Sequence, residues 1–304
     1  MTEHSTPPDA PDEPDAPAAP APRAVAVVGG GRMGAGIAQS FATAGSRVVI
    51  VESGADAAAA LERVAGGLRR AAERGRLAAG TDPEEVRSRV RAVRSVEELA
   101  AGPEPELVVE AVPEDAALKA RVLAAAERAV GPDAVLATNT SSLSVTELAA
   151  ALARPGRFLG MHFFNPVPAS ELVELVTAAE TGPAALAAAH GWTRTLGKTA
   201  VVVRDSPGFA SSRLGVALGL EAIRMAEEGV AAPADIDAAM RLGYKHPMGP
   251  LRLTDLVGLD VRLAIAEHLC RTLGDRFAPP ELLRAKVARG ELGRKAGQGF
   301  YTWP

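Results

Sequence analysis

The sequence lacks the features that mark disulfide-bonded, metal-bearing and membrane proteins. Its 304 residues contain one cysteine, Cys270, which excludes an internal disulfide framework and fits a reducing setting. None of its five histidines is spaced with other ligands as a metal-coordinating set, so no metal site is predicted. No apolar run reaches the roughly 18–20 residues that a transmembrane helix needs. We therefore expect a cytoplasmic protein with no membrane partner.

The charge and the first residues exclude further classes. A formal net charge of −4 argues against a broad nucleic-acid interface, so no nucleic-acid partner is expected. Residues 1–22 are rich in Pro, Ala and Asp, and they have neither the apolar stretch of a secretory signal nor the arginines of a transit peptide. Because prolines disfavour helices and central strands, we predict a disordered tail over 1–22.

A glycine motif stands at the start of the ordered sequence. An apolar run at 24–28 predicts a buried strand, and Gly29, Gly31 and Gly34 follow it as G-x-G-x-x-G before a small-residue helix at 33–44. In this context the motif is typical of dinucleotide binding, because its glycines allow a tight turn, a close pyrophosphate and close helix packing. The helix N-terminus then offers N–H groups to the phosphates. The cofactor-binding residues predicted here are Gly29, Gly30, Gly31, Arg32, Met33 and Gly34.

The type of dinucleotide is indicated by Glu52, which ends the second predicted strand at 47–52. Its carboxylate can accept hydrogen bonds from the adenosine ribose hydroxyls and would repel a 2′-phosphate. NAD is therefore the predicted cofactor, although the neighbouring Arg32 and Ser53 leave the preference over NADP partly open.

Alternating strand and helix patterns extend to about residue 205. Further strands are predicted at 89–95, 106–112, 134–139, 157–163, 172–177 and 199–203, with helices at 56–77, 115–130 and 185–197. This order predicts an α/β fold with a Rossmann-like, doubly wound, mostly parallel sheet, whose ligands bind at the carboxyl ends of the strands. After residue 205 only helical patterns occur. The predicted domains are a dinucleotide-binding domain at 23–205 and an all-α domain at 206–304.

The segment "GMHFFNPVPASELVELV" places His162 and Glu174 in two successive apolar strands. A buried imidazole and a buried carboxylate are costly unless each satisfies the other. The pair is either structural or an acid/base device. Its position at the same sheet edge as the dinucleotide motif favours the second interpretation, in which His162 moves a proton and Glu174 stabilises the imidazolium. Ser141 and Asn165 would offer polar contacts to the substrate oxygen.

Structural roles account for other polar residues. Ser144 and Glu147 have the spacing of a capping box and predict a helix start, which leaves Ser141 free to act at the sheet edge. His190 and His268 lie in helical patterns, and His246 lies in a turn between predicted helices. We expect structural or surface roles for these three histidines.

Motifs along the whole chain resemble one family. "VVGGGRMGAGIAQ", "VVEAVPEDAALK", "NTSSLSV", "GMHFFNPVP", "RDSPGF", "HPMGPLRLTDLVGLD" and "GRKAGQGFY" together resemble the L-3-hydroxyacyl-CoA dehydrogenase family, in particular its bacterial 3-hydroxybutyryl-CoA branch. The resemblance implies an oxidoreductase that interconverts an (S)-3-hydroxyacyl-CoA and a 3-ketoacyl-CoA with NAD. It also implies a homodimer formed through the helical domain and a role in fatty acid metabolism such as β-oxidation.

The resemblance also assigns individual positions. His162 matches the family's catalytic histidine, Glu174 its partner carboxylate, and Ser141 the serine that binds the substrate's 3-oxygen. Asn165 matches the active-site asparagine. The residues implied to contact the cofactor beyond the glycine motif and Glu52 are Glu114, Lys119, Asn139, Ser141, Asn165 and Lys295.

Departures from the family pattern concern the cofactor and the substrate. Glu52 stands where the family more often has aspartate, a change that keeps the charge and adds one methylene. Ser212 stands where the family has asparagine, and Gly67 stands where it has a CoA-binding serine. Arg74 stands where it has lysine and keeps the positive charge for a CoA phosphate. Arg74 and Ser212 are the predicted substrate-binding residues besides Ser141. The arginines of 69–76 have an alternative interpretation as a solvated helix face.

Two other functions stay open at this point. The first is a dehydrogenase of the same fold that acts on a 3-hydroxy compound without CoA, such as a sugar acid or a carnitine-type substrate. The second is a non-catalytic dinucleotide-binding protein, which the intact set of His162, Glu174, Ser141 and Asn165 disfavours.

Overall fold

The computed structural model of the chain describes residues 20–53 and 57–304, so most of the predicted tail lies outside the described residues. The chain divides into two compact units, here named the sheet unit (to Asp205) and the helical unit (Ser206–Pro304). No helix in the described ranges combines the length and the apolar character that crossing a membrane requires.

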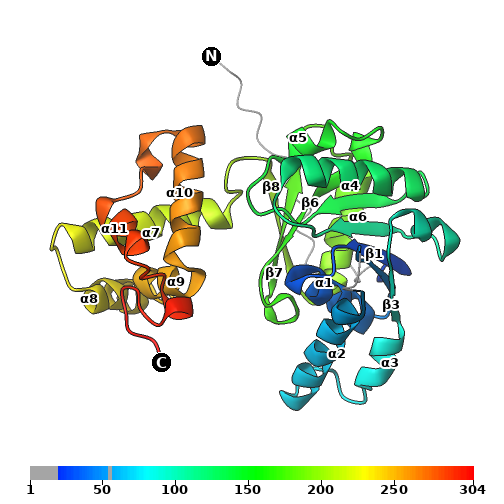
Figure 1. Ribbon diagram of the computed structural model, residues 1–304, viewed down its shortest axis with the longest axis horizontal. Coiled ribbons are helices and arrows are strands. Elements are labelled where there is room, and N and C mark those ends of the chain that lie inside the picture. Colours follow the sequence, from blue (N-terminus) through cyan, green and yellow to red (C-terminus); the bar gives the residue numbers. More distant parts are fainter. Residues whose placement is uncertain (1–19, 54–56) are drawn as a thin grey trace. The chain divides into compact units, whose positions relative to one another are not determined.

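The sheet unit is built on eight strands in the order β3-β2-β1-β4-β5-β6-β7-β8 (Figure 1). All neighbouring strands pair in parallel except β6 and β7, which pair antiparallel. The strands are β1 Ala24–Val28, β2 Arg47–Val51, β3 Val90–Val93, β4 Leu107–Glu110, β5 Val135–Thr138, β6 Phe158–Phe163, β7 Leu172–Thr177 and β8 Thr199–Arg204. The predicted doubly wound, mostly parallel α/β sheet is confirmed.

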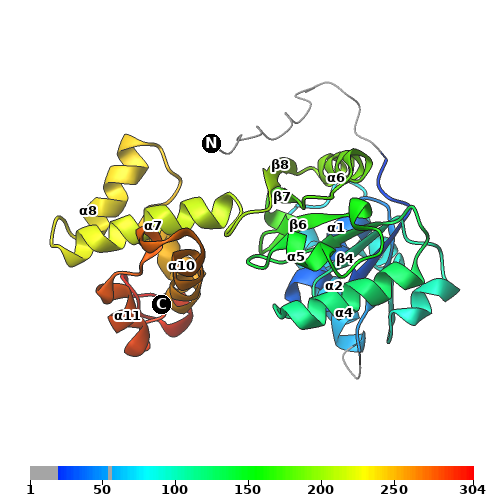
Figure 2. The ribbon, with the colours of Figure 1, turned by 90° about the horizontal axis from the view of Figure 1, so that it is seen from above.

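Helices cover both faces of this sheet (Figures 1 and 2). They are α1 Arg32–Thr43, α2 Ala57–Glu73, α3 Pro83–Ser88, α4 Ala116–Ala129, α5 Val145–Ala149 and α6 Pro183–Thr195. Helix α5 begins at the predicted cap, where the Ser144 side chain accepts a hydrogen bond from Glu147 N. Helix α2 ends earlier than the predicted Leu77, because Gly75 turns the chain with a φ of 62°. Helix α3 was not predicted; Asp82 caps it and Pro83 begins it.

The two faces of the sheet differ in polarity at its carboxyl edge. Alternate residues of the central strands, such as Val109, Ala137 and Met161, pack in one apolar core with helices α1, α2 and α6. Since neighbouring residues of a strand point to opposite faces, the residues next to them lie on the other face. That face carries four buried polar residues: Glu110, Thr138, His162 and Glu174. Buried polar side chains need partners, so this face defines where the polar chemistry of the unit gathers.

The glycine turn between β1 and α1 is shaped by close contacts. Gly29 has a φ of 105°, a conformation that side chains rarely adopt, and its N–H donates to Val51 O at 2.9 Å. A Cβ atom at Gly34 would lie 1.8 Å from Gly29 O, so the helix can approach the turn only without a side chain there. A Cβ atom at Gly31 would meet nothing within 4 Å.

The helical unit contains α7 Ser211–Glu227, α8 Pro233–Ala238, α9 Pro250–Val257, α10 Leu259–Leu273 and α11 Glu281–Ala288. Helix α11 was not predicted, and within residues 206–304 the structure has isolated β-bridges but no named strand. The carboxylate of Asp255, which is 1% exposed, fastens the chain end by accepting hydrogen bonds from Phe300 N, Tyr301 N and Trp303 Nε1. The last residues of the chain are therefore held against α9.

We predict that Gly34→Ala destabilises the sheet unit by about 1–3 kcal/mol, because the new methyl group must displace the Gly29 carbonyl from a closely packed turn. Amide hydrogen exchange, followed by mass spectrometry on peptides from β1 and β2, measures the opening free energy of this region directly. Exchange in these peptides as slow as in the wild type would contradict the packing argument.

Gly31→Ala is the matched control, since it adds the same methyl group to the same turn in open space. The loss of a favourable N-cap glycine destabilises the folded state, whereas the reduced entropy of the unfolded chain stabilises it. The opening free energy should therefore change by less than about 1 kcal/mol.

Candidate active site

Five neighbouring parallel strands, β2, β1, β4, β5 and β6, form the predicted carboxyl edge of the sheet. Val28 pairs with both Val51 and Glu110, Glu110 pairs with Thr138, and Thr138 pairs with Gly160. The segments that follow these strands therefore begin side by side at the carboxyl edge. They are the glycine turn, Glu52, the loop 111–114, the loop 139–142 and the end of β6 with His162.

His162 and Glu174 face each other across the antiparallel pair β6–β7. They are partners in the strand register, and His162 Nδ1 lies 2.8 Å from Glu174 Oε2. The two side chains are 9% and 1% exposed. The contact assigns Nδ1 of the ring to Glu174, so a ligand can exchange a proton with this imidazole only at Nε2. The ring of Phe164 lies beside the imidazole with 4.5 Å between ring centroids.

A buried ionic cluster joins β4 to α4 on the same face of the sheet. Lys119 Nζ lies 2.8 Å from Glu110 Oε1 and 3.3 Å from Glu114 Oε2, and it also donates to Val112 O at 3.1 Å. The lysine side chain is 1% exposed. Glu110 also accepts a hydrogen bond from Thr138 Oγ1 at 2.6 Å. The Lys119 ammonium thus makes two hydrogen bonds and one further ion pair with protein oxygens, and the cluster fixes the loop 111–114.

Glu114 links this loop to the loop 139–142 after β5, here named the serine loop because it contains Ser141 and Ser142. Its Oε1 accepts hydrogen bonds from Thr140 Oγ1 at 2.5 Å, Ser141 N at 2.9 Å and Ser142 N at 3.1 Å. Burial raises the pKa of the Glu114 carboxyl, but these hydrogen bonds and the charge of Lys119 outweigh it, and the pKa is lowered. Glu114 therefore stays ionised and holds Ser141 at the sheet edge, with Ser141 Oγ 3.5 Å from the carboxylate.

Asn139 directly follows β5, and Asn165 lies two residues beyond the end of β6. Asn139 Oδ1 accepts a hydrogen bond from Phe163 N at 2.9 Å, which ties the two strand ends together. Asn165 is exposed at the start of the β6–β7 loop and precedes a cis peptide bond to Pro166. The structure thus brings Asn139 and the His162 strand into contact and leaves the Asn165 side chain accessible.

The glycine turn has the form of a dinucleotide cradle. Gly30 N donates to Glu52 Oε2 at 2.6 Å, so the carboxylate lies against the turn rather than in solvent. On the other side, Arg63 Nη1 donates to Gly30 O at 2.9 Å. Gly31, the N-cap residue of α1, has no side chain that could cap the helix, and an added Cβ atom there would meet no atom of the described residues within 4 Å. These features fit a pyrophosphate at the helix N-terminus and a ribose beside Glu52.

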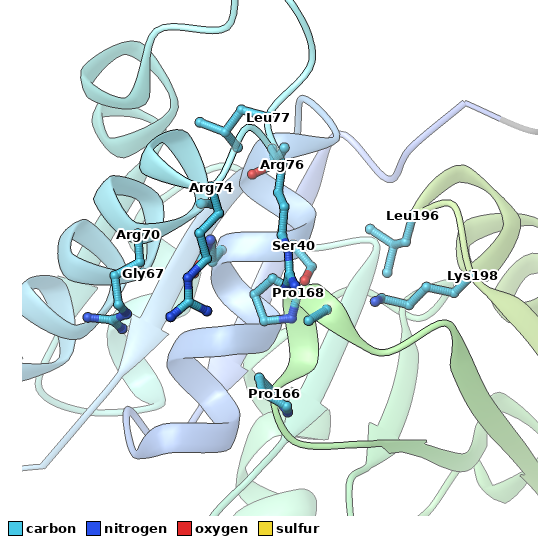
Figure 3. Close-up of a pocket in the computed structure, with 14 residues that line it drawn as sticks. Ser40, Gly67, Arg70, Arg74, Arg76, Leu77, Pro166, Pro168, Leu196 and Lys198 are labelled. Atoms are coloured by element: carbon cyan, nitrogen blue, oxygen red, sulfur yellow. The ribbon is translucent and has the colours of Figure 1, made fainter. Parts of the chain in front are cut away.

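A basic pocket lies between α1, the end of α2 and the β6–β7 loop (Figure 3). Figure 3 shows Arg70, Arg74 and Arg76 on one side and Lys198 on the other. Pro166 and Pro168 of the β6–β7 loop also line it, as does Gly67. A Cβ atom at Gly67 would lie 2.1 Å from Gln39 Oε1, so the glutamine fills the space that a side chain at 67 would need. Arg74 therefore faces a pocket rather than only a solvated helix face.

Two predicted residues belong to the helical unit. Lys295 Nζ lies 2.6 Å from the Asp260 carboxylate, and hydrogen bonding and attraction from Lys295 lower the pKa of Asp260 against the effect of its burial. Ser212 lies half-buried in the first turn of α7. The structure describes both residues within their own unit, and their predicted contacts with NAD and substrate stay predictions.

Sequence reasoning missed the residues that support the site from behind. Glu110 was placed only within a segment, although a carboxylate ending the apolar run "LVVE" is a visible signal of a buried polar contact. Lys198 follows a helix-ending glycine directly before β8, which gave no indication of its buried contacts with the β6–β7 loop. Arg63 lies among other charged residues of α2 and could not be singled out.

Comparisons with known proteins show the family of this chain. The NAD-binding domain of 3-hydroxyacyl-CoA dehydrogenase matches residues 24–206, and the C-terminal domain of the same enzyme matches residues 208–303. A 3-hydroxybutyryl-CoA dehydrogenase of Mycobacterium tuberculosis is 44% identical over 284 residues, 92% of this chain and 98% of that protein. A probable 3-hydroxybutyryl-CoA dehydrogenase of Bacillus subtilis is 42% identical over 281 residues, 92% of this chain and 96% of that protein.

The solved structures include a close match in fold. The crystal structure of (S)-3-hydroxybutyryl-CoA dehydrogenase from Ralstonia eutropha superposes with a TM-score of 0.87 at 39% identity, covering 93% of this chain and 100% of that chain. The resemblance inferred from the motifs and the prediction of NAD as cofactor are confirmed. The chain belongs to the 3-hydroxyacyl-CoA dehydrogenase family and is an NAD-dependent dehydrogenase.

Proposed function

We propose that this enzyme interconverts (S)-3-hydroxybutyryl-CoA and acetoacetyl-CoA with NAD through the pair His162–Glu174. The observation that carries the proposal is the 2.8 Å contact between Nδ1 of His162 and the carboxylate of Glu174 at the carboxyl edge of a dinucleotide-binding sheet. An acid/base group and a hydride carrier are what the oxidation of a secondary alcohol requires.

His162 carries the proton at Nε2. Bound NADH supplies the hydride for the reduction of the ketone. In that direction the imidazolium of His162 donates its Nε2 proton to the 3-oxygen of the substrate, and in the oxidation direction the neutral ring takes the hydroxyl proton. Glu174 accepts the Nδ1–H, which fixes the tautomer and stabilises the positive charge when the ring is protonated.

Ser141 and Asn165 orient the substrate in this proposal. The hydroxyl of Ser141 binds the 3-oxygen, and its place is fixed because Glu114 holds the backbone of the same loop. Asn165 contributes an accessible amide from the β6–β7 loop. Lys119 supports the cofactor side in this proposal, because its buried ammonium holds Glu110 and Glu114. Its direct contact with NAD stays a prediction.

The basic pocket supports an acyl-CoA as substrate. CoA carries phosphate groups, and the pocket beside the β6–β7 loop is lined by Arg70, Arg74 and Arg76. This loop begins two residues after His162. In this proposal Arg74 binds a CoA phosphate. The missing serine hydroxyl at Gly67 is not replaced by another side chain on α2, because Gln39 from α1 fills the space.

A homodimer through the helical unit is part of the same proposal. The unit exposes large apolar side chains on α7, α9 and α10, namely Leu214, Leu253, Val257 and Val261. Exposed apolar side chains gathered in one unit support a protein–protein interface. The role of Ser212 toward substrate, that of Lys295 toward NAD, the cytoplasmic location and the place in β-oxidation also stay predictions.

We predict that His162→Gln lowers kcat for acetoacetyl-CoA reduction by about 10²–10⁴-fold, because the proton donor at Nε2 is lost. NADH affinity, measured by fluorescence titration, should stay within about twofold, since the glycine turn is unchanged. His190→Gln on α6 is the matched control and should keep the wild-type kcat. Near-normal turnover by His162→Gln would remove the pair from the mechanism.

Glu52→Gln should lower the preference for NADH over NADPH, expressed as the ratio of kcat/KM values, by about tenfold or more. Removing the carboxylate charge removes its repulsion of a 2′-phosphate, which is worth on the order of 1 kcal/mol or more at short range. Glu62→Gln on the exposed side of α2 serves as the charge-matched control. If the preference of Glu52→Gln equals that of the wild type, the ribose is recognised elsewhere.

The substrate is tested with acetoacetyl-CoA, acetoacetyl-pantetheine, free acetoacetate and carnitine-type ketones under the same conditions. We expect the highest kcat/KM with acetoacetyl-CoA. Arg74→Gln should raise KM for acetoacetyl-CoA about tenfold and leave acetoacetyl-pantetheine unaffected, because only CoA carries the phosphates that a cation binds.

Arg121→Gln removes an exposed arginine of α4 and should change neither substrate. Free acetoacetate turned over as efficiently as the thioester would favour the alternative without CoA, and NADH binding without turnover of any ketone would favour a non-catalytic protein.

A further inference from the structure

Lys198 is a buried lysine that the proposed reaction does not use. It directly precedes β8 and is 7% exposed. Its Nζ donates to the backbone oxygens of Val167 at 2.7 Å and Ser170 at 2.5 Å. Burial lowers the pKa of the Lys198 ammonium, and the negative charge of Glu171 offsets only part of this effect. A protein buries an ammonium at this cost only where the contacts that it makes matter for the fold or the function.

The two oxygens belong to the loop that joins β6 to β7. This loop contains a short 3₁₀ turn, Val167–Ala169, within which Ala169 N bonds to Pro166 O. So short a turn leaves most of its carbonyls without partners in the loop. Lys198 reaches across from the start of β8 and donates to one of them, Val167 O, and to Ser170 O directly after the turn. One flexible side chain thus fixes both ends of the turn.

The same loop is pressed against the dinucleotide-binding helix. Val167 is 2% exposed, and a Cβ atom at Gly36 of α1 would lie 2.9 Å from Val167 Cβ. The loop follows His162 of β6, contains Asn165 and precedes Glu174 of β7, so its position affects both strands of the antiparallel hairpin. Its prolines Pro166 and Pro168 line the basic pocket (Figure 3).

We propose that Lys198 is a positioning residue: its two hydrogen bonds hold the loop 166–170 so that Asn165 and the pocket wall keep their places relative to His162 and Glu174. This inference rests on the proposed function of that site. An ammonium group has three hydrogens, which suits two carbonyls at once, and a methionine of similar length offers none.

The test is Lys198→Met, assayed with acetoacetyl-CoA, acetoacetyl-pantetheine and NADH. Misplacement of a substrate-orienting group by about 1 Å costs about 10²-fold in rate. We expect kcat/KM for acetoacetyl-CoA to fall by about that factor and the fall to be equally large with acetoacetyl-pantetheine. The Kd for NADH, measured by fluorescence titration, should stay within about twofold of the wild type and reports that the sheet unit is folded.

Lys286→Met is the matched control in the helical unit, where Lys286 Nζ donates to Gly299 O at 2.9 Å and pairs with Glu291. It removes a lysine–carbonyl contact of the same kind and should leave all kinetic constants unchanged. Lys198→Arg, which restores two donors, should recover part of the lost kcat/KM.

Three outcomes would overturn the inference. Unchanged kinetics of Lys198→Met would show that the loop holds its place without the lysine. A defect confined to acetoacetyl-CoA would show that the lysine acts by its charge on the CoA phosphates. A parallel loss of NADH binding would show a role in the fold as a whole. Failure of the wild type with both thioesters would instead reject the proposed function.

Discussion

The contact between His162 and Glu174 is the constraint on which the rest of the site depends. A carboxylate that is 1% exposed inside an apolar strand is strongly unfavourable unless it is paired, and the imidazole at 2.8 Å is its partner. The contact is made across β6–β7, the antiparallel pair in an otherwise parallel sheet of described strands. In such a hairpin the strand that carries the carboxylate returns directly beside the strand that carries the histidine, so the two residues meet by register alone.

A second buried charge cluster fixes the loop between β4 and α4. Glu110, Lys119 and Glu114 form a chain of charged contacts from the interior of β4 to the surface loop before α4. The innermost member is 0% exposed, so the cluster is anchored in the core, and the outermost member holds the serine loop. Both polar devices lie on the face of the sheet opposite the core of α1, α2 and α6. The apolar face provides stability, and the other face holds the buried charges of the proposed site.

The sequence was most informative where local pattern and physics coincide. The strand-flanked glycine motif predicted the β1–α1 turn, and the rule that parallel strands end at one edge predicted which loops meet there. The pair His162–Glu174 was predicted because two buried titratable groups in adjacent strands had to satisfy each other. These inferences need only periodicity, chain direction and the cost of burying charge.

The remaining features depend on contacts between residues far apart in the chain. Nothing near Lys198 in the sequence indicates that it holds carbonyls 31 and 28 residues away. Lys119 could be assigned to the cofactor by resemblance, but its burial and its three oxygen partners follow only from the packing of α4 on β4. Helix α2 ends at Glu73 because Gly75 adopts a left-handed conformation. The helix-favouring residues on both sides of Gly75 predicted a longer helix.

The hydrogen bonds that Glu114 accepts from the loop 140–142 have an energetic consequence for ligand binding. They fix Thr140, Ser141 and Ser142 in the folded enzyme before any substrate arrives. The conformational entropy of this loop is therefore lost during folding and not during binding, at about 1–2 kcal/mol for each backbone residue. More of the interaction energy between the serine loop and a ligand is then available as affinity, and the folding stability of the sheet unit bears the cost.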